Sequence, residues 1–117
     1  MKKISAILMI VSLVGCSAII SKNSPNHSLQ EINIPTAQCN MCVARIDEAL
    51  YGIDGILKYK VELDDLIVKV KYDNQKISVQ QIEKIISKTG YQANDVPADL
   101  EAYKKLDLCC KLPKDRQ

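Results

Sequence analysis

The sequence predicts an α+β fold, a ferredoxin-like βαββαβ sandwich with a short C-terminal helical extension. Three observations predict it. Short segments alternate apolar and polar residues, as half-buried strands do. Two segments between them repeat apolar residues every three or four positions, as helices do. Turn residues separate the segments in the order strand, helix, strand, strand, helix, strand. We therefore expect the helices on one face of an antiparallel sheet, with lysines on the other face.

The first strand and the first helix are predicted on either side of a cysteine loop. The strand is expected at residues 29–36, where Ile32 and Ile34 lie two apart. Pro35 ends it, because proline has no N–H to donate and restricts the residue before it. A helix then begins near residue 43, with apolar residues at helical spacing and glycines after its last turn. Its apolar residues are Val43, Ile46, Leu50 and Ile53, and its glycines are Gly52 and Gly55.

The next two strands form a predicted hairpin. Residues 57–63 and 66–72 both alternate apolar and charged side chains. Asp64-Asp65 joins them as a two-residue link, which is a common length for a hairpin turn.

The second helix has a capping signature at its start. Ser78 is followed three residues later by Gln81, which is the capping-box pattern, and Gly90 closes the helix. Residues 91–96 are then expected to form a short last strand.

Residues 97–117 form a predicted C-terminal tail. Apolar residues three apart indicate a short amphipathic helix whose apolar side can dock on the domain. These residues are Leu100, Tyr103 and Leu106. The segment reaches two adjacent cysteines, Cys109 and Cys110, before Pro113 stops it.

The N-terminus has the pattern of an export signal. Residues 1–15 are a basic start followed by an apolar run that is too short for a membrane span, which needs about 20 residues. The sequence Leu13-Val14-Gly15-Cys16 resembles the lipobox of bacterial lipoproteins. That resemblance implies cleavage before Cys16 and lipidation of its sulfur, with residues 16–28 as lipidated cysteine and flexible tether. The expected location is the outer membrane facing the periplasm, or the cell surface.

Two other interpretations of the N-terminus remain open. The first fifteen residues can be an ordinary cleaved signal, or a short buried helix. Either would leave Cys16 as an odd thiol, which exported proteins tend to avoid.

Charge and residue types exclude several function classes. Removal of residues 1–15 takes Lys2 and Lys3 from the 16 Lys and Arg, which leaves 14 against 14 Asp and Glu. No basic stripe remains of the kind that phosphate binding requires, so no nucleic acid is expected. The chain has one His and no glycine-rich loop, so neither a catalytic triad nor a phosphate cradle is indicated. We expect a protein that acts by binding and is not an enzyme.

The best candidate site is the pair Cys39 and Cys42, in a Cys-x-x-Cys pattern between the first strand and the first helix. Thiolates are preferred ligands of soft ions such as Cu(I), and two at this spacing can converge on one ion.

With this element order, residues 30–95 resemble the heavy-metal-associated (HMA) domain of copper chaperones, P-type ATPase modules and the periplasmic mercury-binding protein. The domain is assigned to residues 29–96.

The resemblance implies further roles. Cys39 and Cys42 would bind a heavy-metal ion, with Cu(I) favoured and Hg(II), Zn(II) or Cd(II) as alternatives. The family's usual loop is Gly-Met-Thr-Cys-x-x-Cys, whereas Thr36-Ala37-Gln38 precedes Cys39 here. Tyr91 matches the aromatic residue that bacterial members place beside the loop, where it would shield the metal; it can equally be a core tyrosine. The implied partners are a metal-transporting ATPase, another transporter or another metallochaperone, and the membrane through the lipid.

Cys109 and Cys110 leave three interpretations open. The tail can fold back so that four sulfurs meet, which suits tetrahedral Zn(II) or a multi-copper cluster. They can pair with Cys39 or Cys42 in a disulfide, or have no role. The competing functions are a thiol-disulfide redox protein and a disulfide-stapled structural lipoprotein, since an exported chain meets oxidising conditions. A thioredoxin-like protein also has Cys-x-x-Cys, but the predicted order of elements differs from that fold.

Overall fold

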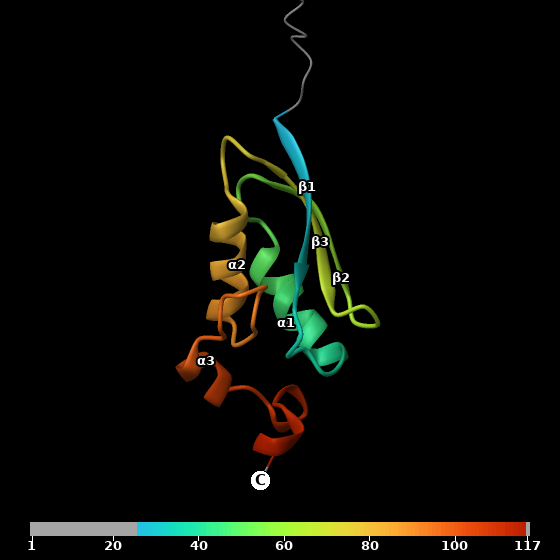
Figure 1. Ribbon diagram of the computed structural model, residues 1–117, viewed down its shortest axis with the longest axis vertical. Coiled ribbons are helices and arrows are strands. Elements are labelled where there is room, and N and C mark those ends of the chain that lie inside the picture. The colour runs from blue at the N-terminus through green and yellow to red at the C-terminus, as the bar shows by residue number, and fades with distance from the viewer. Residues whose placement is uncertain (1–25, 117) are drawn as a thin grey trace, which may run out of the picture.

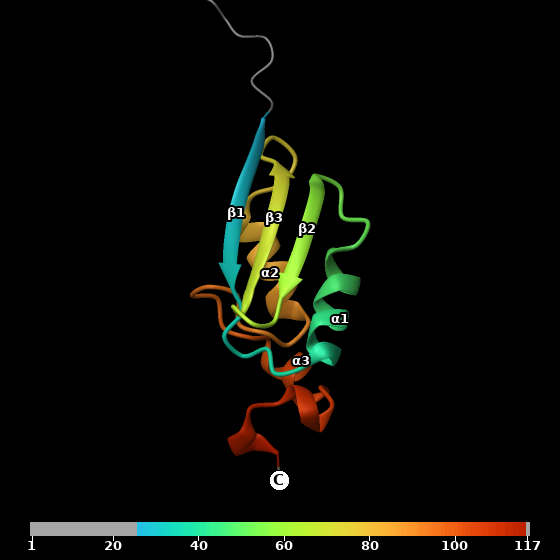
Figure 2. The same ribbon diagram turned by 90° about the vertical axis from the view of Figure 1, so that its right-hand side faces the viewer.

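The computed structural model describes residues 26–116, and Cys16 with the predicted export signal lies outside them. The elements are β1 (His27–Asn33), α1 (Asn40–Leu50), β2 (Ile56–Glu62), β3 (Ile67–Asp73), α2 (Val79–Lys88) and α3 (Leu100–Lys104). Short 3-10 turns follow at Leu108–Cys110 and Pro113–Asp115. The strands form one antiparallel sheet in the order β1-β3-β2, and α1 and α2 cover one of its faces (Figures 1 and 2). The α+β class is therefore confirmed.

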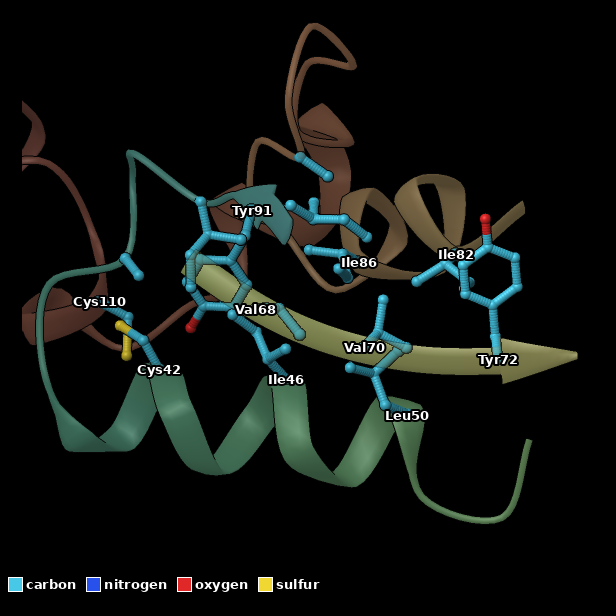
Figure 3. Packing of buried hydrophobic residues seen from close by; sticks show 14 of the residues in the cluster. Cys42, Ile46, Leu50, Val68, Val70, Tyr72, Ile82, Ile86, Tyr91 and Cys110 are labelled. Atoms are coloured by element: carbon cyan, nitrogen blue, oxygen red, sulfur yellow. The ribbon is translucent and has the colours of Figure 1, made fainter. Parts of the chain in front are cut away.

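The core between sheet and helices is mainly aliphatic. Alternating residues of β1 and β3 meet one face of each helix, and Figure 3 shows these side chains converging on β3. Fully buried aliphatic residues in this cluster are Ile32, Ile34, Ile46, Leu50, Val68, Ile82 and Ile86. Burial of each such side chain contributes about 1.5–3 kcal/mol, so this packing fixes how α1 lies on the sheet.

Helix α2 begins and ends where the sequence predicts. The Ser78 Oγ accepts from the Gln81 backbone N at 3.2 Å, and the Gln81 Oε1 accepts from the Ser78 backbone N at 2.9 Å. The predicted capping box is confirmed. Gly90 follows the helix with φ +103°, a conformation that favours glycine.

The turn between β2 and β3 is longer than predicted. The strands end at Glu62 and begin again at Ile67, so four residues connect them where two were expected. Leu66 takes a positive φ of 53°, and its carbonyl accepts from the Ile34 backbone N at 2.8 Å. The Leu66 N–H also donates to the Leu63 carbonyl at 3.3 Å, so residues 63–66 form a turn that is tied to the end of β1.

The predicted last strand is not present as a ladder strand. Residues 91–96 contain one isolated bridge, between Ala93 and Val96. Asn94 interrupts the strand because its φ is +50°, and its side-chain oxygen accepts from the Asn33 backbone N at 2.8 Å. Its own N–H donates to the Asn33 carbonyl at 2.8 Å. The segment therefore lies beside the end of β1 in the expected place, but as a tight turn.

The tail docks against the domain with a shorter helix than predicted. Helix α3 has five residues, and Leu106 behind it is buried whereas Leu100 is 63% exposed. The Ser87 Oγ donates to the Pro97 carbonyl at 2.6 Å, which fixes the start of the tail to α2. Of the helices described in residues 26–116, none combines the length and apolar character that a membrane span requires.

Candidate metal centre

The cysteine loop joins the end of β1 to the start of α1. Cys39 is the N-cap of α1, and Cys42 lies in the first turn, where its backbone N donates to the Cys39 carbonyl at 2.9 Å. The Gln38 backbone N donates to the Cys42 sulfur at 3.4 Å. Ala37 is buried beneath the loop, at the position where the resemblance places a methionine. The loop backbone thus holds both sulfurs on the same side.

The tail returns to this loop at the lower end of the molecule in Figure 1. Asp107 forms an ion pair with Arg45 of α1, with 2.7 Å between Nη2 and Oδ2. The carbonyl of Asp107 accepts from the Cys110 backbone N at 2.8 Å, which begins the 3-10 turn carrying both tail cysteines. The ion pair and the turn bring Cys109 and Cys110 to the start of α1.

Four cysteine sulfurs consequently meet. The Cys39 Sγ lies 3.7 Å from that of Cys42, 3.6 Å from that of Cys109 and 3.9 Å from that of Cys110. The sulfurs of Cys109 and Cys110 are 3.9 Å apart. All four are free thiols in the structure. Residues about seventy positions apart in sequence therefore share one sulfur cluster.

Exposure differs across this cluster. Cys42 and Cys110 are fully buried, Cys39 is half-buried and Cys109 is exposed. The cluster therefore has an inner side, which water does not reach, and an outer side, which a second molecule can touch.

The pKa values of three of these thiols are shifted in different directions. Burial is the largest single influence on Cys39 and raises its pKa, but the Cys42 and Met41 backbone and the neighbouring thiols outweigh it and lower the pKa to about 7. Burial, with the adjacent Cys42, raises the pKa of Cys110 to about 12. Contact with Cys39 raises the pKa of Cys109. Cys39 is thus the thiol of this group best prepared to start binding as a thiolate.

Tyr91 lies directly beside the inner sulfurs. Its side chain is fully buried, and its hydroxyl has no hydrogen-bond partner. Figure 3 shows this hydroxyl pointing towards Cys42, next to Cys110. Burial and then the neighbouring Cys42 and Cys110 raise the pKa of the phenol, so it remains a neutral donor. A buried donor without an acceptor fits a site that gains negative charge when thiolates form.

Two residues near the cluster were not singled out from the sequence. The Met41 Sδ lies 3.6 Å from the Cys109 Sγ, and Arg45 holds Asp107. A signal for Met41 exists in the sequence, since it stands between the two cysteines of the loop and its thioether is a soft donor. Nothing local in the sequence indicates the ion pair between Arg45 and Asp107.

The donor set fits a soft metal ion. For a metal–thiolate bond of about 2.3 Å, ligand sulfurs lie about 3.8 Å apart around a tetrahedral ion and about 4.0 Å apart around a trigonal one. The four sulfur–sulfur distances of 3.6 to 3.9 Å match these spacings. No histidine or carboxylate belongs to the group of potential ligands found in the described residues, which favours a soft ion over a hard one.

The fold and the cysteine cluster together define a small thiol-rich binding domain of the ferredoxin-like class. The heavy-metal-associated domain matches residues 31–92, which is more than half of the chain. The chain belongs to the heavy-metal-associated domain family.

Three related proteins illustrate the relationship. The chain is 41% identical to the copper chaperone CopZ of Enterococcus hirae over 64 residues, covering 55% of this chain and 93% of that protein. The metal-free structure of that chaperone superimposes with a TM-score of 0.52. The Cu(I)-loaded N-terminal domain of a potential copper-translocating P-type ATPase from Bacillus subtilis is 26% identical, with a TM-score of 0.55 over 58% of this chain and 85% of that domain. The mercury-bound form of the bacterial periplasmic protein MerP is 25% identical, with a TM-score of 0.51 over 58% of this chain and 94% of that protein.

These comparisons settle the class of activity. The chain carries a heavy-metal-binding domain like that of copper chaperones, so the expectation of a binding protein and not an enzyme is confirmed. The matched residues 31–92 include Cys39, Cys42 and Tyr91 but end before the tail. Cys109 and Cys110 are therefore additions to the domain that the family shares.

Proposed function

We propose that this chain is an exported, lipid-anchored metallochaperone or scavenger that binds a soft heavy-metal ion, with Cu(I) favoured, through Cys39 and Cys42. Cys109 and Cys110 complete the site from the tail. The observation that carries the proposal is the convergence of four sulfurs, with the Cys39 Sγ within 3.9 Å of the other three, in a domain of this family.

The preference for Cu(I) rests on donor chemistry and on relatives. Every potential ligand of the cluster is sulfur, which soft ions prefer. Of the three relatives compared above, one is a copper chaperone, one is a Cu(I)-loaded domain and one is a mercury-bound protein. Hg(II), Zn(II) and Cd(II) also accept thiolates, and availability decides among such ions as much as affinity does.

Capture and release follow from the gradient of exposure. Cys109 and Cys39 face the solvent, so an incoming ion meets them first and passes to Cys42 and Cys110 by exchange of one thiolate at a time. Each thiol loses its proton as it binds, because the thiolate is the ligand. The neutral Tyr91 hydroxyl then has a thiolate to which it can donate, and it shields the inner ligands from water.

The proposed partner is a metal-transporting ATPase or another metallochaperone. A partner carrying its own exposed thiols could take the ion from Cys39 and Cys109 by the same stepwise exchange. The likeness to a P-type ATPase domain supports a partner of similar fold. The proposed place is the membrane surface on the exported side, reached through lipid on Cys16, because Leu13-Val14-Gly15-Cys16 has the lipobox pattern.

Native mass spectrometry of the full chain tests metal binding. Cys16→Ser leaves only the four clustered thiols. A free-thiol count on protein purified without reductant comes first, followed by anaerobic titration of reduced protein with Cu(I) and with Zn(II). We expect free thiols and Cu(I) uptake that Cys39→Ser abolishes. If the four thiols arrive as disulfides and the reduced protein binds no ion, the proposal fails and the redox or structural alternative takes its place.

A further inference from the structure

The four cysteine sulfurs are arranged as two triangles that share one edge. The sulfurs of Cys39, Cys42 and Cys110 all lie within 4.8 Å of one another and form the inner triangle. The sulfurs of Cys39, Cys109 and Cys110 form the outer triangle, with sides of 3.6, 3.9 and 3.9 Å. The shared edge is the 3.9 Å between Cys39 and Cys110.

A single tetrahedral ion does not fit all four. It would need each pair of sulfurs about 3.8 Å apart. Cys109 lies outside the set whose sulfurs are mutually within 4.8 Å, although it is close to both Cys39 and Cys110. The long pair is therefore Cys42 with Cys109. One ion can bind three of the sulfurs, but it cannot reach the fourth without rearrangement.

A fifth sulfur extends the outer triangle. The Met41 Sδ is 3.6 Å from the Cys109 Sγ, and Met41 is 48% exposed. A neutral thioether is a suitable additional donor for Cu(I). The outer triangle with Met41 is thus a separate set of soft donors on the solvent side of the cluster.

Building on the proposed function, we propose that the chain binds two Cu(I) ions in adjacent sites, one held by Cys39, Cys42 and Cys110 and the other by Cys39, Cys109 and Cys110 with Met41. Cys39 and Cys110 bridge the two ions. Two Cu(I) ions replace four thiol protons, so the loaded cluster carries a net charge of −2. The Arg45 guanidinium close to Cys110 is already paired with the Asp107 carboxylate at 2.7 Å, so this ion pair adds no net charge to the cluster.

The stoichiometry of Cu(I) binding tests this inference. The full chain with Cys16→Ser is reduced and titrated with Cu(I) against a competing Cu(I) chelator, and monomers are weighed by native mass spectrometry. We expect two Cu(I) ions per monomer at saturation, and a copper–copper scattering path in the X-ray absorption spectrum of the doubly loaded protein.

Variants separate the two sites. Cys109→Ser should limit the monomer to one tightly bound ion, because the outer triangle loses a corner. Met41→Leu should weaken the second ion about tenfold, equivalent to about 1.4 kcal/mol, and leave the first unchanged. Leu108→Ala is the matched control, since Leu108 is also exposed and is adjacent to Cys109 but offers no donor. Circular dichroism checks that each variant is folded.

The outcomes distinguish this inference from the proposed function. Failure to bind any Cu(I) overturns both. A parent protein that saturates with one ion per monomer, or that holds two only as a dimer, overturns the two-site arrangement and leaves the proposed function standing. A second ion that survives Cys109→Ser overturns the assignment of the outer site.

Discussion

Cys39 has its sulfur within 4 Å of the sulfurs of Cys42, Cys109 and Cys110. We expect Cys39→Ser to weaken Cu(I) binding by more than about 100-fold, because it removes a ligand that is also one of the two sulfurs shared by the triangles. Cys42→Ser should also abolish high-affinity binding. The measurement is competition with a Cu(I) chelator, with the Cys16→Ser chain as reference. Unchanged affinity in both variants would contradict the assignment of the loop cysteines.

The shifted pKa of Cys39 predicts its reactivity. In the folded metal-free protein, alkylation of Cys39 should reach half its maximal rate near pH 7, against 9.0 for an ordinary thiol. Cys110 should react slowly throughout, because burial raises its pKa to about 12.

The same shift links the stability of the fold to pH. Since the folded pKa of Cys39 is lowered, its thiolate stabilises the fold fully above pH 9, and this contribution is lost as pH falls through 7.

Peptide mass spectrometry after alkylation at each pH measures both thiols in one sample. Protein unfolded in urea is the control, and both cysteines should then react alike. A half-point for Cys39 near 9 in the folded protein would contradict the lowering of its pKa by the Cys42 and Met41 backbone and the neighbouring thiols.

Tyr91 should affect the metal-free and loaded states in opposite directions. Its hydroxyl has no partner when the metal is absent, and such a group costs about 1–3 kcal/mol. We therefore expect Tyr91→Phe to leave thermal stability of the metal-free protein unchanged or higher, and to lower Cu(I) affinity about tenfold, because a hydrogen bond to a thiolate is lost.

Tyr59→Phe is the matched control for Tyr91. The Tyr59 hydroxyl donates to the Asp47 carbonyl at 3.0 Å. Its loss should reduce stability without changing the affinity for copper. If Tyr91→Phe binds Cu(I) as tightly as the parent, the hydroxyl has no role in shielding the metal.

At the scale of elements, Gly90 links helix α2 to the docked tail. A methyl group there would lie 3.1 Å from the Leu106 Cδ1 and 3.1 Å from the Tyr103 backbone N, and φ is +103°. We expect Gly90→Ala to destabilise the fold by about 1–3 kcal/mol and to speed alkylation of Cys110 as the tail loosens. Gly52→Ala is the control, because Gly52 has φ +74° but nothing within 4 Å of the added methyl. Equal effects of the two substitutions would show that the contact with the tail does not matter.

Elements whose signals are local could be predicted from the sequence. Ser78 and Gln81 form the predicted capping box, and alternation placed β1, β2 and β3 to within a few residues. The sequence wrongly predicted a last strand, because the turn that replaces it depends on Asn94 adopting a positive φ and bonding to Asn33 at the end of β1. The choice of Cys39 and Cys42 as candidate ligands followed from their Cys-x-x-Cys spacing. Their meeting with Cys110 was one of three alternatives for the tail, and the sequence could not choose among them, because the tail is held by long-range contacts such as the ion pair between Arg45 and Asp107 over 62 positions and the burial of Leu106.

For the whole molecule, membrane attachment is the prediction that lies outside the described residues. In a bacterial host the chain should fractionate with membranes, and Cys16→Ser should release it, because lipid on that sulfur is the proposed anchor. Immunoblots of membrane and soluble fractions measure this. The control is Cys109→Ser, which removes an exposed thiol without touching the lipobox. A chain that remains in the membrane fraction after Cys16→Ser would contradict lipidation.

The sulfur cluster and the start of β1 lie at opposite ends of the sheet (Figure 1). The seven residues of β1 span about 24 Å at about 3.4 Å each. With a lipid on Cys16, the ten residues 17–26 can add at most about 36 Å. The thiols would then lie in the layer of water within roughly 60 Å of the bilayer, at the end of the domain that points away from it. A partner whose binding loop extends into this layer of water can contact the thiols directly. A binding site at the lipid surface can contact them only if the whole domain turns over.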